Sequence, residues 1–264
     1  MARAGADAAR RALRGRAKTA TISHMQVGVY GLGRFGSFWA EVLAEHFPVK
    51  AYNRNPDRGT PDNVERVSPA ELGECDTIFL CVAISAMEPV VRELAPHIGA
   101  GTTVADTCSV KVYPVDVMRR HLPEGVGILA THPMFGPDSA GDGLEGLPMI
   151  FWPERVDEKT VGYWVDWFDR LGLRTVRMSP DEHDHEAAYT QGITHFIGRV
   201  LDDLSVKPSA IGTMGYRKIL EVVEQTCNDP VQLFLDLQRY NPYTTEMRAK
   251  LKASLERVLA QFGE

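Results

Sequence analysis

The chain has 264 residues, of which 44% are hydrophobic and 24% charged, values that are typical of a folded protein with one or two domains. Its longest apolar runs are far shorter than the ~20 residues that cross a bilayer, so we expect no transmembrane helix. With 29 basic and 35 acidic side chains the net charge is −6, which argues against general affinity for nucleic acid. The four cysteines lack the spacing of a zinc site and indicate a reducing compartment.

Residues 1–24 are rich in alanine and arginine and stand apart from the rest of the sequence. Three interpretations remain open: a short basic tail, an upstream start that precedes a true beginning at Met25, or an organelle-targeting peptide. The scarcity of serine and the short length argue against targeting, and the lack of an apolar segment argues against secretion. We therefore expect a cytoplasmic protein, with organelle targeting as the less favoured alternative.

From residue 26 onward, short apolar runs alternate with longer amphipathic stretches, which is typical of a parallel sheet with crossover helices. The apolar runs predict strands at 27–30, 49–52, 77–82, 103–105, 127–130, 149–152 and 174–178. The amphipathic stretches predict helices at 35–47, 86–94, 115–121 and 158–171.

After residue 181 only helical periodicity remains, with helices predicted at 186–204, 209–226, 230–239 and 244–262. A boundary near residues 178–181 divides the chain into a basic extension (1–24), an α/β domain (25–179) and an all-helical domain (180–264). Four helices are too few to bury all their apolar faces, so we expect a homodimer that forms through the helical domain.

A glycine-rich motif, GLGRFG at residues 31–36, joins the first predicted strand to the first predicted helix. Glycines at such a turn let the backbone approach a pyrophosphate, which the helix N-terminus stabilises. The context predicts a Rossmann-type, mostly parallel sheet that binds a dinucleotide. The predicted cofactor-binding residues of the motif are Gly31, Gly33, Arg34, Phe35 and Gly36.

Asn53 and Arg54 follow the second predicted strand, where an NAD-selective site usually places an acid. A carboxylate there would bind the ribose hydroxyls and repel a 2′-phosphate, whereas an amide and a cation would not. The pair predicts NADP as the cofactor, with NAD as the alternative, unless Arg54 is only a solvated turn residue.

Two further strand ends carry polar side chains, in the segments DTCSVK (106–111) and THPMFGP (131–137). Ligands collect at the carboxyl ends of parallel strands. His132 could take a proton from a substrate hydroxyl while hydride leaves the same carbon, and Ser109 could bind that hydroxyl or position the nicotinamide. The alternative is a structural, hydrogen-bonded histidine.

These motifs resemble the prephenate/arogenate dehydrogenase family of tyrosine biosynthesis. The resemblance extends over residues 26–245 and includes segments 182–185 (EHDH) and 193–196 (ITHF). The THPMFGP stretch is far more specific than the glycine motif. Segments 198–201 and 215–216 are similar to the plant-type enzymes, which prefer NADP.

The resemblance implies an oxidative decarboxylation in which ring C4 loses a hydride, the ring carboxylate leaves as CO2 and the ring becomes aromatic. His132 matches the family's catalytic histidine, Ser109 its hydroxyl-binding serine and His195 a position near the substrate. Gln191, His195 and Arg199 recur every four residues and form one polar edge of a predicted helix. This edge could face the substrate cleft, with His195 and Arg199 as substrate-binding residues; the alternative is a solvated stripe.

Arg217 is a candidate for binding a substrate carboxylate, although a helix-surface pair with Glu221 is an alternative. Gln225 matches a position that is acidic in plant-type enzymes acting on arogenate and neutral in those acting on prephenate. A carboxylate there would attract the ammonium group of arogenate. Gln225 therefore favours prephenate, unless the neighbouring Glu224 faces the substrate.

Other interpretations remain open. One is arogenate dehydrogenase activity; another is a β-hydroxyacid dehydrogenase or imine reductase, although those enzymes usually place a lysine in the helical half. A third is an NADP-binding redox sensor without catalysis. His183 and His185 are two residues apart on a predicted helix and point in different directions, so we expect no metal site.

Overall fold

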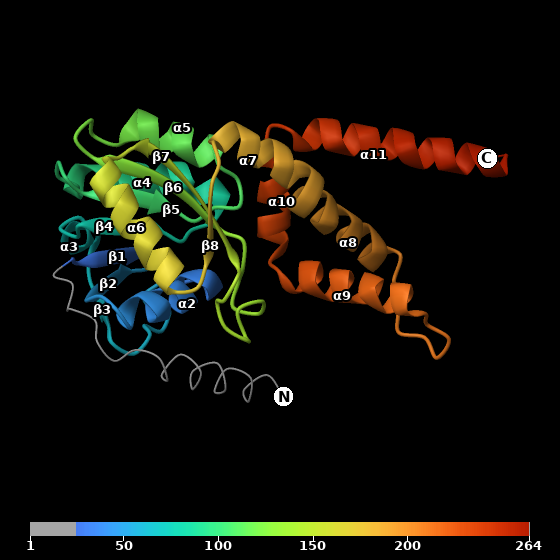
Figure 1. Cartoon of the computed structure of the whole chain (residues 1–264), viewed down its shortest axis with the longest axis horizontal. Coiled ribbons are helices and arrows are strands. Elements are labelled where there is room, and N and C mark those ends of the chain that lie inside the picture. Colours follow the sequence, from blue (N-terminus) through green and yellow to red (C-terminus); the bar gives the residue numbers. More distant parts are fainter. Residues whose placement is uncertain (1–24, 264) are drawn as a thin grey trace. The chain divides into compact units, whose positions relative to one another are not determined.

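The computed structural model describes residues 25–263 and consists of two compact units (Figure 1). The sheet unit contains residues 25–82, Ala86–Ser109 and Pro114–Ser179, and the helical unit contains Ala83–Ser85, Val110–Tyr113 and residues 180–263. The alternatives for residues 1–24 lie outside the described residues. Between residues 25 and 263, no helix is both long and apolar enough to cross a membrane.

The sheet unit is built on one eight-stranded sheet, in the order β3-β2-β1-β4-β5-β6-β7-β8. All neighbouring strands are parallel except β6 and β7, which are antiparallel. The predicted α/β fold with a mostly parallel sheet is therefore confirmed. The strands are β1 (Val27–Tyr30), β2 (Val49–Tyr52), β3 (Val64–Arg66), β4 (Thr77–Leu80), β5 (Thr103–Asp106), β6 (Gly127–Pro133), β7 (Pro148–Arg155) and β8 (Arg174–Arg177).

The bounds of several strands differ from the prediction, and two of the differences concern the site. Strand β3 has only three residues, two of them exposed, so it has no apolar run by which it could be recognised. Strand β6 continues to Pro133 because it pairs with β7 along its second half, where His132 lies opposite Ile150. His132 is therefore inside a strand and not in the loop after it.

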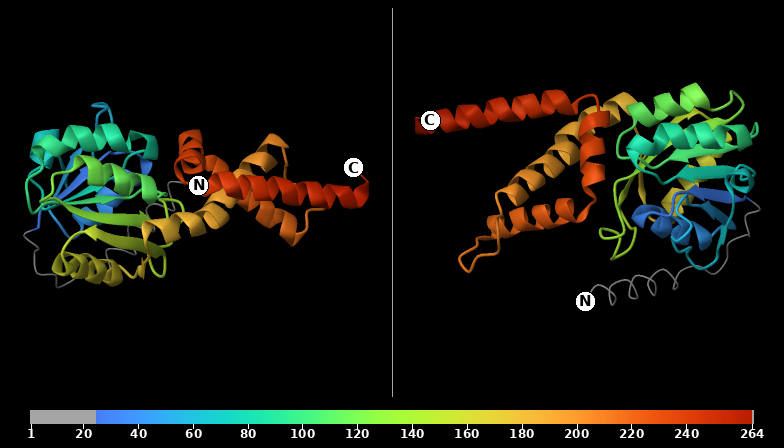
Figure 2. Two further views of the ribbon diagram at one scale, coloured as in Figure 1. Left: turned by 90° about the horizontal axis from the view of Figure 1, so that it is seen from above. Right: turned by 180° about the vertical axis from the view of Figure 1, so that it is seen from behind.

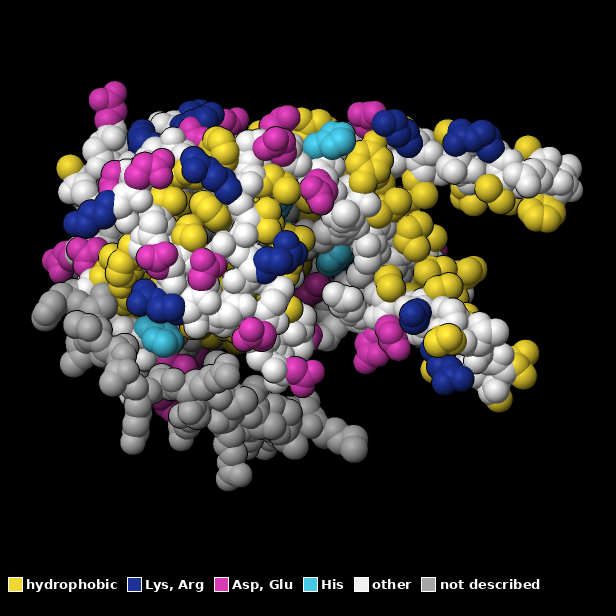
Figure 3. All heavy atoms as spheres, in the orientation of Figure 1, with side chains coloured by type: hydrophobic (Ala, Val, Ile, Leu, Met, Phe, Trp, Pro, Cys, Tyr) yellow, Lys and Arg dark blue, Asp and Glu magenta, His cyan; other side chains and the backbone are white. Residues whose placement is uncertain are grey.

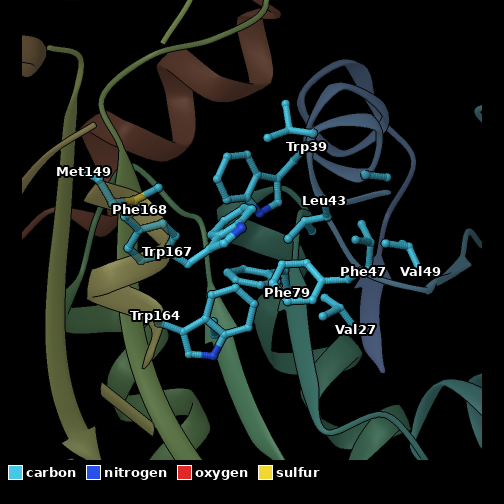
Figure 4. Packing of buried hydrophobic residues seen from close by; sticks show 14 of the residues in the cluster. Val27, Trp39, Leu43, Phe47, Val49, Phe79, Met149, Trp164, Trp167 and Phe168 are labelled. Carbon is cyan, nitrogen blue, oxygen red and sulfur yellow. The ribbon is translucent and has the colours of Figure 1, made fainter. Parts of the chain in front are cut away.

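Helices cover both faces of the sheet, with α4 and α5 on one face and α6 on the other (Figure 2). The core between α2, α6 and the sheet is rich in aromatic rings (Figure 4). Trp39 of α2 lies edge-on to Trp167 of α6 with 5.8 Å between the ring centroids, and Trp164 meets Phe79 of β4 at 5.0 Å. These helices are α2 (Arg34–Ala44), α3 (Pro69–Leu72), α4 (Met87–Leu94), α5 (Val112–His121) and α6 (Glu158–Arg170).

The helical unit confirms the expected helical C-terminal part, although its first predicted helix is interrupted. A π-helical turn, η3, separates two α-helices, and the predicted helix at 209–226 begins later, where the Thr213 side chain caps it by accepting the Tyr216 N–H at 3.2 Å. The elements are α7 (Pro180–Ala187), η3 (Ala188–Gly192), α8 (Ile193–Asp203), α9 (Met214–Asn228), α10 (Val231–Tyr240) and α11 (Thr244–Leu259).

Large hydrophobic side chains are exposed on the helical unit (Figure 3). Within residues 25–263, every large hydrophobic side chain that is strongly exposed belongs to this unit. The set comprises Val200, Leu204, Ile211, Met214, Ile219, Val231, Leu255, Val258, Leu259 and Phe262, and we call it the apolar face.

Candidate functional site

The glycine turn between β1 and α2 has space for side chains at only one of its three glycines. Gly31 has a φ of 101°, in the left-handed region, and a Cβ there would lie 2.4 Å from the Cys81 carbonyl oxygen. A Cβ on Gly36 would lie 1.9 Å from the Gly31 carbonyl oxygen. Gly33, at the N-cap of α2, faces open space. The turn therefore packs α2 tightly on β1 and leaves the helix N-terminus open to an anion.

The other two predicted residues of the motif make contacts within the protein. Phe35 is half-buried and stacks on Trp39, with ring centroids 6.0 Å apart. Arg34 is exposed and forms an ion pair with Asp138. Both can still approach a bound cofactor through their backbone, because they occupy the first turn of α2.

Asn53 connects the end of β2 to the glycine turn. Its Oδ1 accepts the Leu32 N–H at 2.9 Å and its Nδ2 donates to the Asn55 carbonyl at 3.0 Å. The neighbouring Arg54 is exposed and, among the described residues, makes no side-chain hydrogen bond or ion pair. The structure thus places a neutral amide and an open cation at the end of β2.

Two arginines that the sequence analysis missed gather at the same place. Arg58 donates from Nε to the Leu32 carbonyl at 2.8 Å. Arg66, on β3, donates to the carbonyls of Asn53 and Asn55 at 3.0 and 2.9 Å. The available signal was the recurrence of arginine at 54, 58 and 66 in a net acidic chain. Together these side chains make the end of β2 locally basic.

One row of paired residues crosses the centre of the sheet and locates the predicted site. Tyr30 pairs with Leu80, Leu80 with Asp106, and Asp106 with Ala130. The glycine turn, the segment with Ser109 and the end of β6 with His132 all follow directly after this row. The structure therefore gathers the predicted cofactor and catalytic residues of the sheet unit at one edge of the sheet.

His132 and Ser109 are both buried at this edge, with 3% and 7% of their surfaces exposed. Within residues 25–263, Ser109 Oγ is buried and has no hydrogen-bond partner. A buried hydroxyl without a partner is costly unless a ligand or water satisfies it. Ser109 is therefore available to hydrogen-bond a substrate hydroxyl.

In the helical unit, His195 lies beside an acid. Its Nε2 is 3.9 Å from Asp229 Oδ2, its Nδ1 is buried without a partner among the described residues, and 7% of its surface is exposed. Burial lowers the pKa of His195, while Asp229 raises it and Arg199 lowers it again. The net lowering favours a neutral imidazole at pH 7, which can both donate and accept a hydrogen bond.

Arg199 and His195 are on the same helix, but the Arg199 guanidinium makes hydrogen bonds within the protein. Its Nη2 donates to the carbonyls of Thr226 and Asp229 at 3.1 and 2.8 Å, where α9 ends. Cations at the carboxyl end of a helix stabilise its unpaired carbonyls. Arg199 Nε, in contrast, is buried without a partner in the described part of the chain.

The remaining two predicted substrate residues are exposed on α9. Arg217 is in the first turn of this helix, about 14 Å along its axis from Thr226 at 1.5 Å per residue. Within residues 25–263 its side chain makes no ion pair, including none with Glu221. Gln225 and Glu224 are both exposed, whereas the acid near His195 is Asp229.

The EHDH segment has a structural role through Asp184. This fully buried carboxylate accepts the N–H groups of Lys111 and Val112 at 2.6 and 2.9 Å, at the start of α5, and contacts His183 Nδ1 at 2.8 Å. In the part of the chain that the structure describes, no group of three or more His, Cys, Asp and Glu residues could hold a metal ion.

Comparison with known proteins agrees with this geometry. Residues 50–176 match the family model of the prephenate dehydrogenase nucleotide-binding domain, and residues 200–264 match the model of a TYRAAT1-like C-terminal domain. The chain is 32% identical over 248 residues to arogenate dehydrogenase 2, chloroplastic, of Arabidopsis thaliana, covering 89% of this chain and 69% of that protein. It is 32% identical over 257 residues to arogenate dehydrogenase 1, chloroplastic, of the same plant, covering 91% of this chain but only 40% of that longer protein.

Among solved structures, the fold is similar to that of prephenate dehydrogenase from A. aeolicus in complex with hydroxyphenyl propionate and NAD+. The TM-score is 0.70 at 19% identity, over 92% of this chain and 93% of that one. This similarity supports the fold, and the identity to arogenate dehydrogenase 2 over most of both sequences supports the ancestry. The chain belongs to the prephenate/arogenate dehydrogenase family.

Proposed function

We propose that this chain catalyses the oxidative decarboxylation of prephenate or arogenate with NADP. The observation that carries the proposal is the row Tyr30–Leu80–Asp106–Ala130, which puts the glycine turn, Ser109 and His132 at one edge of the sheet. We assign residues 25–179 to cofactor binding and acid–base catalysis, and residues 180–264 to substrate binding and dimerisation. Family membership supports this assignment.

The protein's part in the reaction is to hold the ring and move one proton. Bound NADP+ would supply the acceptor for the hydride that leaves ring C4. Ser109 Oγ hydrogen-bonds the C4 hydroxyl, and His132 accepts its proton as the C–H bond breaks. The bond from the ring to its carboxylate then breaks, its electron pair completes the aromatic ring and CO2 leaves. His132 returns the proton to the phenolate oxygen, so atoms and charge balance.

The arginines at the end of β2 support NADP as the cofactor. Arg54 is open to solvent, Arg58 is fixed to the glycine turn through its Nε, and no acid occupies the Asn53 position. Charge-assisted hydrogen bonds from guanidinium groups suit the dianionic 2′-phosphate, and an amide does not repel it. NAD lacks that phosphate and would leave these cations unused.

The acid beside His195 bears on the choice between the two substrates. Gln225, which favours prephenate on sequence grounds, is exposed, whereas Asp229 lies 3.9 Å from buried His195. A partly buried carboxylate attracts the ammonium group of arogenate more strongly than the keto group of prephenate. We therefore propose that arogenate is also a substrate, with Asp229 as its ammonium-binding residue.

Replacing Asp229 with asparagine should shift the preference from arogenate toward prephenate. Loss of a charge-assisted contact worth about 1.5–3 kcal/mol predicts a fall of about 10- to 100-fold in kcat/KM for arogenate, with little loss for prephenate. Glu224→Gln is the matched control, because it neutralises an exposed acid on the same segment. An equal loss of kcat/KM for both substrates would show that Asp229 does not discriminate between them.

The decisive assay combines prephenate or arogenate with NADP or NAD and follows reduced nicotinamide. We expect turnover with NADP and at least one of the two substrates. NADP binding without turnover of either substrate would instead support the alternative of a redox sensor. Turnover of an unrelated hydroxy acid would support another dehydrogenase class.

We propose that the apolar face is covered by a second copy of the chain. Helix α11 has 16 residues, of which only Thr244 and Met247 are buried, so it gains little from packing within its own unit. Leu204 and Phe262 are 71% and 75% exposed. Contiguous exposed apolar patches usually mark protein interfaces, and the ten exposed large hydrophobic side chains of this set all belong to one unit.

The double variant Leu204→Asp, Leu255→Asp should be monomeric at micromolar concentration, because two charges would have to be buried in the interface. Sedimentation velocity measures this directly, with a dimer expected for the unaltered protein. Lys252→Glu, an exposed polar change on the same helix α11, should remain dimeric. A monomeric unaltered protein would contradict the proposal.

A further inference from the structure

One buried carboxylate connects the segment that carries Ser109 to the strand that carries His132. Asp106 is the last residue of β5 and has no exposed surface. Its Oδ2 accepts the Cys108 N–H at 3.0 Å, and its Oδ1 accepts the Thr131 N–H at 3.4 Å. Its backbone carbonyl also accepts the Thr131 hydroxyl at 2.5 Å.

Both backbone partners of the carboxylate are the immediate neighbours of proposed site residues. Cys108 precedes Ser109 and Thr131 precedes His132. The two oxygens of one side chain therefore hold both the backbone next to Ser109 and the backbone next to His132. We infer that Asp106 is a positioning residue that sets Ser109 Oγ in register with the His132 imidazole. This inference rests on the proposed function, in which those two side chains act on one substrate hydroxyl.

A carboxylate is required for this task because both neighbouring groups are donors. Two N–H groups point at two acceptor oxygens, and an ionised acid is acceptor-only. Asparagine keeps the size of the side chain but would turn an NH2 group toward one of the two N–H groups. The bond to either Cys108 or Thr131 would then be lost, and one side of the link would be free to move.

A further anchor of the serine segment runs to a different strand. Thr107 donates from its backbone and from Oγ1 to the Leu80 carbonyl at 3.2 and 3.0 Å, which ties the segment to β4 and not to β6. Beyond the sheet pairing of Asp106 with Ala130, the carboxylate of Asp106 links the backbone next to Ser109 to the backbone next to His132. A misplacement of about 1 Å between reacting groups can cost on the order of 100-fold in rate.

The test is a double-mutant cycle between Asp106→Asn and Ser109→Ala, read in kcat with NADP and whichever substrate the unaltered enzyme turns over. Asp106→Asn alone should lower kcat by about 10- to 100-fold, with the NADP dissociation constant changed less than about threefold. In the Ser109→Ala background, the same substitution should cost less than about threefold, because there is no hydroxyl left to position.

Thr102→Val is the matched control, since it removes a buried hydrogen bond to the Cys75 carbonyl at the opposite end of β5. We expect it to lower stability and leave kcat unchanged. If Asp106→Asn does not fold, Thr131→Val replaces it in the cycle, because it removes the hydroxyl bond to the Asp106 carbonyl, a second link between the same two segments. Equal losses with and without Ser109, or a parallel loss of NADP affinity, would overturn the inference, whereas absence of turnover in the unaltered enzyme would refute the proposed function instead.

Discussion

Replacing His132 with asparagine is expected to lower kcat by about 10²–10⁴-fold, the usual contribution of a positioned general base. Asparagine can hydrogen-bond the substrate hydroxyl but cannot accept its proton at neutral pH. His132 is 3% exposed and pairs with Ile150 inside the sheet. The smaller asparagine side chain therefore fits in its place without changing the protein surface. The measurement is single-turnover and steady-state formation of reduced nicotinamide with NADP in excess.

The dissociation constant for NADP should stay within about twofold in the same variant, because the glycine turn and the arginines are untouched. His97→Asn is the matched control, since His97 is an exposed histidine of the same unit. We expect its kcat to equal that of the unaltered enzyme. A parallel loss of cofactor affinity in His132→Asn would mean that the imidazole maintains the structure and takes no part in proton transfer.

Replacing Arg54 and Arg58 together with glutamine should weaken NADP binding by about 100-fold or more and NAD binding by less than about threefold. The estimate takes two charge-assisted hydrogen bonds at about 1.5–3 kcal/mol each and discounts them for solvent screening at an exposed site. Fluorescence titration with both cofactors gives the two dissociation constants. The advantage of NADP over NAD should also shrink as salt is added to the unaltered protein.

Arg58 makes one contact that could obscure this result, because its Nε also holds the Leu32 carbonyl of the glycine turn. The single variant Arg54→Gln separates the two effects, since among the described residues Arg54 makes no side-chain hydrogen bond or ion pair. Arg92→Gln, on an exposed face of α4, controls for the general loss of charge. Equal weakening of NAD and NADP would show that the arginines only support the loop.

The sequence predicted the parts of the fold that have strong local signals. Strands β1 and β2 have the predicted bounds because each is a short run that ends at a turn residue, Gly31 or Asn53. The glycine motif was recognisable because two of its positions exclude any side chain. The α/β fold, the helical C-terminal part and the family all follow from signals of this kind, and the structure and comparisons confirm them.

The features that were missed depend on contacts between distant segments. Arg66 reaches the end of β2 only because β3 pairs there, and β3 has too few buried residues to be predicted. Asp229 lies near His195 because α8 and α9 cross closely, where a Cβ on Gly198 would lie 2.0 Å from Thr226 Oγ1. The family resemblance along the sequence, which led to Gln225, does not contain that information.

The π-helical turn η3 also determines which way the His195 imidazole faces. A π turn accommodates one residue more than an α turn, and each residue of an α-helix advances the side-chain direction by about 100°. The direction in which the His195 side chain leaves the helix axis is thus fixed by the number of residues between α7 and α8. The last residue of η3 is held in place by a hydrogen bond from Gln238 Nε2 to the Gly192 carbonyl at 2.8 Å. Among related chains, a one-residue gap at this point would reorient the imidazole without altering any side chain around it.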